Sequence, residues 1–156
     1  FNHESPRRGD YFVTQKIVKG IKDVVDGKIE VLEIGNPDAT RDWGHAKDYV
    51  KAMWLMLQQE RPDDYVVATG VEHSVKDLVN CVAKKYDINL EWNDQGAINS
   101  KTGARVLEIS PKFFRPCEVD QLLGDSTKVR SIGWNPEFTF ETLIEDMVLN
   151  NSSLKN

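Results

Sequence analysis

Cysteine and histidine are scarce in this chain, and neither is spaced as a metal site or a disulfide framework requires. The 156 residues include two cysteines and three histidines, with no CxxC pair and no metal-ligand spacing among them. We therefore expect Cys81 and Cys117 to be reduced thiols and expect no structural metal. Because reduced thiols are typical of intracellular proteins, the expected location is the cytoplasm.

Long apolar runs and long basic runs are missing as well. No stretch approaches the roughly 20 apolar residues of a membrane span, and the first residues contain neither the basic nor the apolar region of a secretory signal. The formal net charge is −5 without any Lys/Arg cluster, so we expect neither a nucleic-acid partner nor a membrane. An anionic ligand would have to be held by a few placed cations, which favours a small molecule.

Two motifs of nicotinamide-dependent enzymes are absent. The sequence contains no GxGxxG turn, so it does not carry its own cradle for the phosphates of a dinucleotide. It also contains no Tyr-x-x-x-Lys pair. The chain begins at Phe1 without a methionine, and we expect it to be part of a longer polypeptide.

What is present is an alternation of apolar patterns. Apolar residues at helical spacing predict helices over residues 13–24, 46 to near 62, 75–86, 126–132 and 139–148. Short apolar runs predict strands over residues 31–34, 65–69, 89–92 and 106–109. Residues 39–45 and 93–103 are predicted as loops, and Trp54 is expected in the core because it lies in a helical apolar stripe. This alternation favours an α/β or α+β domain.

A few cations have the character of phosphate ligands. Arg41 and Arg115 offer rigid donor forks, and Lys16 adds a mobile point charge, so these three residues would suffice for a diphosphate if they converged. The alternative is that each is a solvated charge or a structural ion pair. Glu118 could accept hydrogen bonds from sugar or base groups, or could simply be exposed.

Two further side chains are candidates for a ligand site. His3 is able to donate to a phosphate, although a lone histidine is more often a local hydrogen-bond partner. Trp43, between Asp42 and Gly44, could stack on a base.

The segment from Phe1 to Gly9, followed by Phe12-Val13-Thr14, resembles a signature of the GDP-mannose 4,6-dehydratases. The resemblance continues through residues 41–50 and the Ala68-Thr69-Gly70 segment, and then through residues 114–120 and 133–136, so it covers nearly the whole chain. It implies the α/β fold of an extended short-chain dehydrogenase/reductase, in which a Rossmann domain binds NADP and a smaller C-terminal domain binds the nucleotide sugar.

The resemblance also implies an activity. In the family, NADP takes a hydride from C4 of GDP-mannose, a Glu base assists loss of water across C5 and C6, and the hydride returns to C6. The product, GDP-4-keto-6-deoxymannose, leads to GDP-fucose and other deoxysugars. The family's catalytic Thr or Ser, Glu, Tyr and Lys precede the segment that begins at Phe1, so no catalytic residue is assigned here.

Binding roles can be carried over residue by residue. His3 and Arg8 resemble the family's NADP contacts, and the residues that resemble its GDP-sugar contacts are Asn2, Lys16, Arg41, Arg115 and Glu118. On this basis residues 1–9 form a junction with the Rossmann domain, residues 10–150 form the nucleotide-sugar-binding domain with the Rossmann half absent, and residues 151–156 form a frayed tail. The full-length enzyme is expected to be a homo-oligomer, either a dimer or a tetramer.

Two other functions remain open from the residues. The chain could be a stand-alone nucleotide-sugar-binding module, or part of a related nucleotide-sugar epimerase or dehydratase with a different base or sugar. On the leading interpretation, the 156 residues alone would be inactive because the catalytic groups lie elsewhere.

Overall fold

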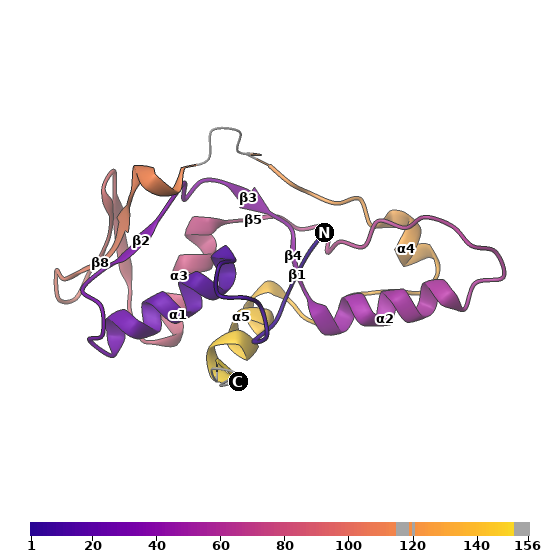
Figure 1. Ribbon diagram of the computed structural model, residues 1–156, viewed down its shortest axis with the longest axis horizontal. Helices are drawn as coiled ribbons and strands as arrows, with labels where there is room; N and C mark the ends of the chain where they lie inside the picture. The colour runs from indigo at the N-terminus through magenta and orange to yellow at the C-terminus, as the bar shows by residue number, and fades with distance from the viewer. Residues whose placement is uncertain (115–118, 120, 152–156) are drawn as a thin grey trace.

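Three helices and a four-stranded sheet enclose the larger of two apolar cores in the computed structural model, which describes residues 1–114, 119 and 121–151. The helices are α1 (Val13–Val25), α3 (Val75–Lys85) and α5 (Phe140–Leu149). The strands, in sheet order, are β2 (Leu32–Ile34), β8 (Arg105–Ile109), β7 (Gly96–Asn99) and β6 (Leu90–Asn93). Figure 1 shows this body at one end of an elongated molecule.

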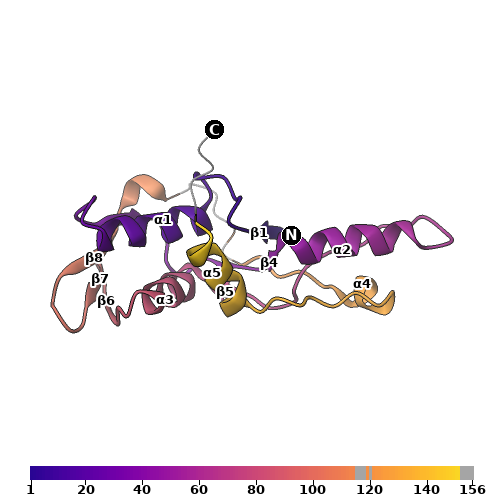
Figure 2. The ribbon, with the colours of Figure 1, turned by 90° about the horizontal axis from the view of Figure 1, so that it is seen from below.

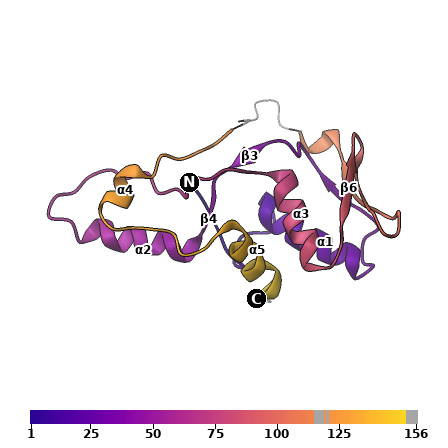
Figure 3. The ribbon, with the colours of Figure 1, turned by 180° about the vertical axis from the view of Figure 1, so that it is seen from behind.

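The sheet is mixed. β2 runs parallel to β8 with Leu32 opposite Leu107, and β7 is antiparallel to both β8 and β6. The pairing Leu32–Leu107 lies on the face that α1 and α3 cover, and both side chains are buried. In Figure 3 the sheet, with β6 labelled, lies beside α3 and α1 at the right-hand end of the molecule.

Helix α1 ends where the sequence predicts and packs very closely on the sheet. Gly27, just beyond its C-terminus, has φ +69°, a left-handed conformation that glycine adopts without strain. Within the helix, a Cβ added at Gly20 would lie 2.4 Å from Leu32 Cδ1. Glycine at this position therefore lets α1 approach β2.

Helices α3 and α5 begin with side-chain caps. The Ser74 hydroxyl accepts from Asp77 N–H while the Asp77 carboxylate accepts from Ser74 N–H, and the two bonds form a capping box. Thr139 and Thr142 form the equivalent box at the start of α5. The caps fix both helix starts by satisfying amides that have no partner inside the helix.

The other end of the molecule is thinner. Its strands are β1 (Asn2–Glu4), parallel to β4 (Trp43–His45), and β3 (Thr40–Arg41), antiparallel to β5 (His73–Ser74). Helices α2 (Ala46–Leu57) and α4 (Thr127–Ser131) extend beyond them, as Figures 1 and 2 show. Ala52, Val129 and Trp134 form a second, smaller core there. A 3-10 helix, η1 (Pro111–Phe113), follows β8.

Several sequence-based assignments are corrected by the structure. The predicted loop 39–45 contains β3 and β4, and the predicted loop 93–103 contains β7. Conversely, residues 65–69, all of which the structure describes, form extended chain without strand pairing, and α2 stops at Leu57 rather than near residue 62. Strand pairing depends on a neighbour that a single segment cannot reveal, whereas helix caps are local.

The outer face of α2 is apolar and exposed. Val50, Met53, Trp54 and Leu57 recur at helical spacing, and Trp54 exposes 61% of its surface. The expectation that Trp54 lies in the core is therefore wrong for this chain. The spacing was correctly interpreted as an amphipathic helix, but only the opposite face, with Tyr49 and Ala52, is buried.

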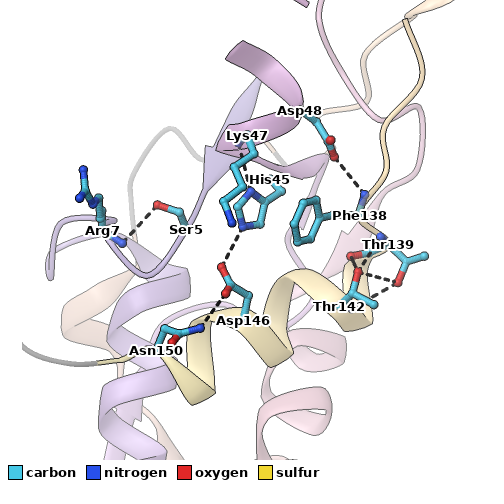
Figure 4. Close-up of polar contacts among 10 residues, drawn as sticks. All are labelled: Ser5, Arg7, His45, Lys47, Asp48, Phe138, Thr139, Thr142, Asp146 and Asn150. Carbon is cyan, nitrogen blue, oxygen red and sulfur yellow. Dashed lines mark hydrogen bonds and ion pairs between the residues drawn. The ribbon is translucent and has the colours of Figure 1, made fainter. Parts of the chain in front are cut away.

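A buried histidine joins the two ends of the molecule (Figure 4). His45 Nδ1 accepts from Lys47 N–H at 3.1 Å and so caps α2, which places the ring hydrogen on Nε2, facing Asp146 Oδ2 of α5 at 2.9 Å. The ring also stacks on Phe138 with 3.8 Å between centroids. Burial raises the pKa of Asp146, but hydrogen bonds from His45 and Asn150 outweigh it, and the net pKa lies below its ordinary value.

The structure bears on the thiols, on metal binding and on membrane spans. Cys81 is a free, half-buried thiol, while Cys117 lies outside the described residues. Across the described residues no group of three or more His, Cys, Asp or Glu side chains is placed to hold a metal ion. In the same part of the chain no helix combines the length and apolarity needed to cross a membrane.

Candidate functional site

A pocket of about 530 Å³ lies where β1, the start of α1 and β3 meet. Its lining brings together Asn2 from β1, Arg8 from the following turn, Lys16 from α1 and Arg41 from β3. These are four of the seven residues to which the sequence assigns binding roles. The volume is within the range of small-molecule sites.

The charge of the lining is opposite to that of the chain. Three basic side chains, Arg8, Lys16 and Arg41, face one acidic side chain, Glu4, although the chain carries a formal net charge of −5. Such local concentration of cations favours an anionic ligand, because a partly enclosed site strengthens each attraction relative to bulk water.

Strand β1 divides its side chains between two sides. Asn2 and Glu4 line the pocket, whereas His3, between them, does not. His3 Nδ1 donates to the Phe1 carbonyl at 3.1 Å, and its ring lies 4.9 Å from that of Tyr49. The structure therefore does not bring His3 and Arg8, the two residues assigned to the cofactor, into one pocket lining.

Arg8 is held from two directions. Its guanidinium carbon lies 3.4 Å from the centre of the Phe12 ring, and its Nε lies 3.1 Å from Glu4 Oε2. Its backbone N–H donates to the Ser5 carbonyl at 2.9 Å, so a tight turn fixes the main chain too. The buried Nε–H makes no hydrogen bond within the described residues, so the contact with Glu4 is an ion pair without hydrogen-bond alignment.

Lys16 lies one turn into α1 and packs on an aromatic ring. Its Nζ is 3.3 Å from the centre of the Phe113 ring, at the end of η1. Partial burial lowers the pKa of Lys16, while Glu33 acts in the opposite direction. The ammonium is therefore partly desolvated and can gain from an anionic ligand.

Arg41 is oriented by main-chain carbonyls. Its Nη1 donates to Thr40 O at 2.7 Å and to Val119 O at 2.6 Å. The next residue, Asp42, is fully buried and accepts from Thr69 N–H, Thr69 Oγ1 and Gly70 N–H at 2.7–2.9 Å. This carboxylate anchors the strand segment that carries Arg41 to the extended chain at residues 69–70.

The N-terminus of α1 opens beside the same pocket. Its N-cap residue, Phe12, lines the pocket and makes no side-chain cap, and the first turn contains no acidic residue. Unsatisfied amides at a helix start carry partial positive charge and favour anions. This feature adds to the three cationic side chains.

The remaining candidates are placed as follows. Arg115 and Glu118 lie outside the described residues. Trp43 lines the pocket but exposes only 3% of its surface and stacks on Phe140 with 6.1 Å between centroids. Its environment is therefore mainly that of a core residue.

Sequence reasoning did not single out Glu4 and Phe113, which both line the pocket. Glu4 and Phe113 contact the cations Arg8 and Lys16, respectively. A signal for Glu4 exists in the sequence, because strand alternation places residue 4 on the same side as Asn2 once β1 is assigned. The proximity of Phe113 to Lys16 depends on packing between distant segments and has no local signal.

Comparison with known proteins decides the family. The sequence profile described as GDP-mannose 4,6 dehydratase matches residues 1–147. The chain belongs to the GDP-mannose 4,6-dehydratase family. Members with this name include a protein of Drosophila melanogaster, 48% identical over 153 residues, and one of Vibrio cholerae, 45% identical over 164 residues. The matches cover 95% and 96% of the chain but 39% and 44% of these relatives.

Solved structures support the fold of this GDP-mannose 4,6-dehydratase family member. RMD from Pseudomonas aeruginosa, complexed with NADPH, matches with a TM-score of 0.76 at 23% identity, over 96% of this chain and 46% of that one. UDP-glucose 4-epimerase from Thermus thermophilus, complexed with NAD, matches with a TM-score of 0.71 at 20% identity, over 98% and 45%. The expected α/β fold is confirmed, and the chain shares it with these two proteins. The chain spans less than half the length of the relatives it matches.

Proposed function

We propose that the chain is the C-terminal, GDP-sugar-binding part of an NADP-dependent GDP-mannose 4,6-dehydratase, a lyase that converts GDP-mannose to GDP-4-keto-6-deoxymannose and water. The observation that carries this proposal is the convergence of Asn2, Arg8, Lys16 and Arg41 around one pocket. Like charges that were merely solvated would repel one another and would not be expected to converge on one pocket. Membership in the family supports GDP-mannose as the anionic ligand.

Within the pocket, the chain's residues would bind and orient the ligand. Lys16 and Arg41 would hold the diphosphate, with the donors of the α1 N-terminus nearby, and Asn2 would hydrogen-bond to the GDP-sugar. Arg115 and Glu118, which the family resemblance assigns to the same ligand, complete the proposed set.

The proposal that this chain contributes to cofactor binding depends mainly on Arg8. Arg8 lines the same pocket as the cations Lys16 and Arg41, which fits a residue that receives an anionic group. Arg8 and His3 would therefore contribute to holding NADP, which, when bound, supplies the hydride acceptor of the reaction. The chain has no Gly-rich dinucleotide turn, so the main cradle must be supplied from outside these 156 residues.

Calorimetric titration of the full-length protein tests the substrate site. Lys16→Gln should weaken GDP-mannose binding about tenfold, the effect of losing one charge-assisted contact. Lys22→Gln is the matched control, because Lys22 lies on the same helix, pairs with Asp26 and does not line the pocket. Equal GDP-mannose affinity for both variants would refute the site, and tighter binding of UDP-glucose than of GDP-mannose would favour a related epimerase.

Arg115→Lys tests a residue outside the described part of the chain. Lysine keeps the charge but loses the two-pronged donor geometry, so GDP-mannose binding should weaken about fivefold to thirtyfold while NADP binding changes little. Unchanged affinity for GDP-mannose would show that Arg115 does not contact the diphosphate.

The activity, location and assembly of the protein are proposed on the same basis. The 156-residue chain alone should not dehydrate GDP-mannose even with NADP added, because the catalytic groups of the family are not in it. Turnover by the pure 156-residue chain would contradict this. A cytoplasmic location and a homo-oligomeric state of the full-length enzyme are also proposed, and sedimentation of the full-length enzyme tests the latter.

A further inference from the structure

A buried carboxylate lies beside the cations of the pocket. Glu4 is 2% exposed, although glutamate is almost never buried to this extent without a partner. Its Oε2 accepts from Thr14 Oγ1 at 2.5 Å and lies 3.1 Å from Arg8 Nε. One oxygen therefore joins the first turn of α1 to the guanidinium.

The contacts that restrain Arg8 do not involve the two terminal nitrogens of its guanidinium. The Nε side of the guanidinium meets Glu4, and one face lies on the Phe12 ring. No hydrogen bond engages the two terminal nitrogens within the part of the chain that the structure describes. Those nitrogens form the edge that binds a phosphate through two parallel bonds.

The charge of Glu4 does not stabilise the fold. Burial raises the pKa of Glu4, and the opposing effects of Thr14, Arg8 and His3 do not cancel it. When a folded-state pKa lies above the unfolded one, the stabilising contribution exists at low pH and is lost as pH rises through the folded value. Ionisation of the Glu4 carboxylate therefore costs more free energy in the folded chain than in the unfolded chain.

We propose that Glu4 is a positioning residue: its carboxylate, held by Thr14, orients the Arg8 guanidinium toward a phosphate group of the ligand. The proposal rests on the function proposed above, which assigns Arg8 to NADP. A guanidinium that is already oriented loses less conformational freedom when the ligand binds, so affinity is higher than for a mobile arginine.

Double-mutant titration of the full-length protein tests the proposal. Glu4→Gln keeps the shape and removes the charge, and it should weaken NADP binding about twofold to tenfold without lowering the thermal midpoint. In an Arg8→Ala background the same substitution should produce no further loss. Glu137→Gln is the matched control, because Glu137 is exposed and pairs with Lys51 away from the pocket.

Thr14→Val provides a second route that leaves Glu4 in place. Loss of the hydroxyl frees the carboxylate, so NADP binding should weaken in the same direction and again only when Arg8 is present. The proposal is overturned if Glu4→Gln weakens NADP equally with and without Arg8, or if it lowers the thermal midpoint while affinity is unchanged. Failure of the parent protein to bind GDP-mannose would instead overturn the proposed function.

Discussion

Replacement of Asp42 by asparagine should destabilise the protein far more than its small change in shape suggests. Asp42 is fully buried, and its two oxygens divide the donors between them. Oδ1 accepts from Thr69 N–H at 2.9 Å and Thr69 Oγ1 at 2.7 Å, while Oδ2 accepts from Gly70 N–H at 2.9 Å. Asparagine has one acceptor oxygen, so either orientation of its amide sets an NH₂ group against a backbone N–H.

The magnitude follows from these contacts. An unsatisfied buried donor costs about 1–3 kcal/mol, and replacing charge-assisted by neutral hydrogen bonds costs about 1 kcal/mol more. We therefore expect a loss of about 2–4 kcal/mol, which corresponds to about 5–15 °C in thermal midpoint for a domain of this size. Amide hydrogen exchange at residues 66–70 should accelerate, because the extended segment loses its anchor.

The assay compares Asp42→Asn with the control Asp64→Asn. Asp64 is exposed and lies on the loop that precedes residues 66–70. Thermal unfolding gives the global effect, and exchange measured by mass spectrometry gives the local one. If Asp42→Asn unfolds at the parent temperature and residues 66–70 exchange at the parent rate, the buried carboxylate does not anchor this segment and the reasoning fails.

Three further substitutions test the packing. Asp146→Asn should cost about 1 kcal/mol at pH 7 by weakening the bond from His45, and because the pKa of Asp146 is lowered in the folded state, denaturant titrations should show this difference shrinking as pH falls below about 4. Gly20→Ala should cost about 1–2 kcal/mol through the clash with Leu32, and a double-mutant cycle should show the cost vanish in a Leu32→Ala background. Trp134→Phe should cost about 1–3 kcal/mol in urea unfolding, because the buried indole N–H donates to a carbonyl of α2 at 2.8 Å. If any of the three variants is as stable as the parent protein, the contact that it removes does not stabilise the fold.

Helices were predictable because their signals lie in a few adjacent residues. The Ser74–Asp77 capping box and the left-handed Gly27 are local features, and the structure has both. Strand β7 was missed because its flanks are rich in turn-forming residues, and its pairing with β6 and β8 decides its conformation. Residues 65–69 carry an apolar run typical of a strand but find no pairing partner within the described residues.

The candidate site was predictable by residue type and not by position. Lys16 and Arg41 have the chemistry of phosphate ligands, but their convergence requires β1 to pair with β4 across about 40 residues of chain, in the register Asn2 to Trp43. The hydrophobic periodicity of the sequence does not indicate which distant strands pair. The role of Glu4 required in addition the burial and the 3.1 Å contact with Arg8, both of which depend on the assembled fold.

The exposed face of α2 makes one tryptophan an optical reporter. Trp43 and Trp134 are buried, and the indole N–H of the half-buried Trp92 donates to Asn80, whereas Trp54 stands largely in water. Trp54 should therefore emit at longer wavelength than the others and be quenched by acrylamide. Anything that covers the helix would shift that emission to the blue and protect it from quenching, so the fluorescence spectrum distinguishes a bare α2 from a covered one.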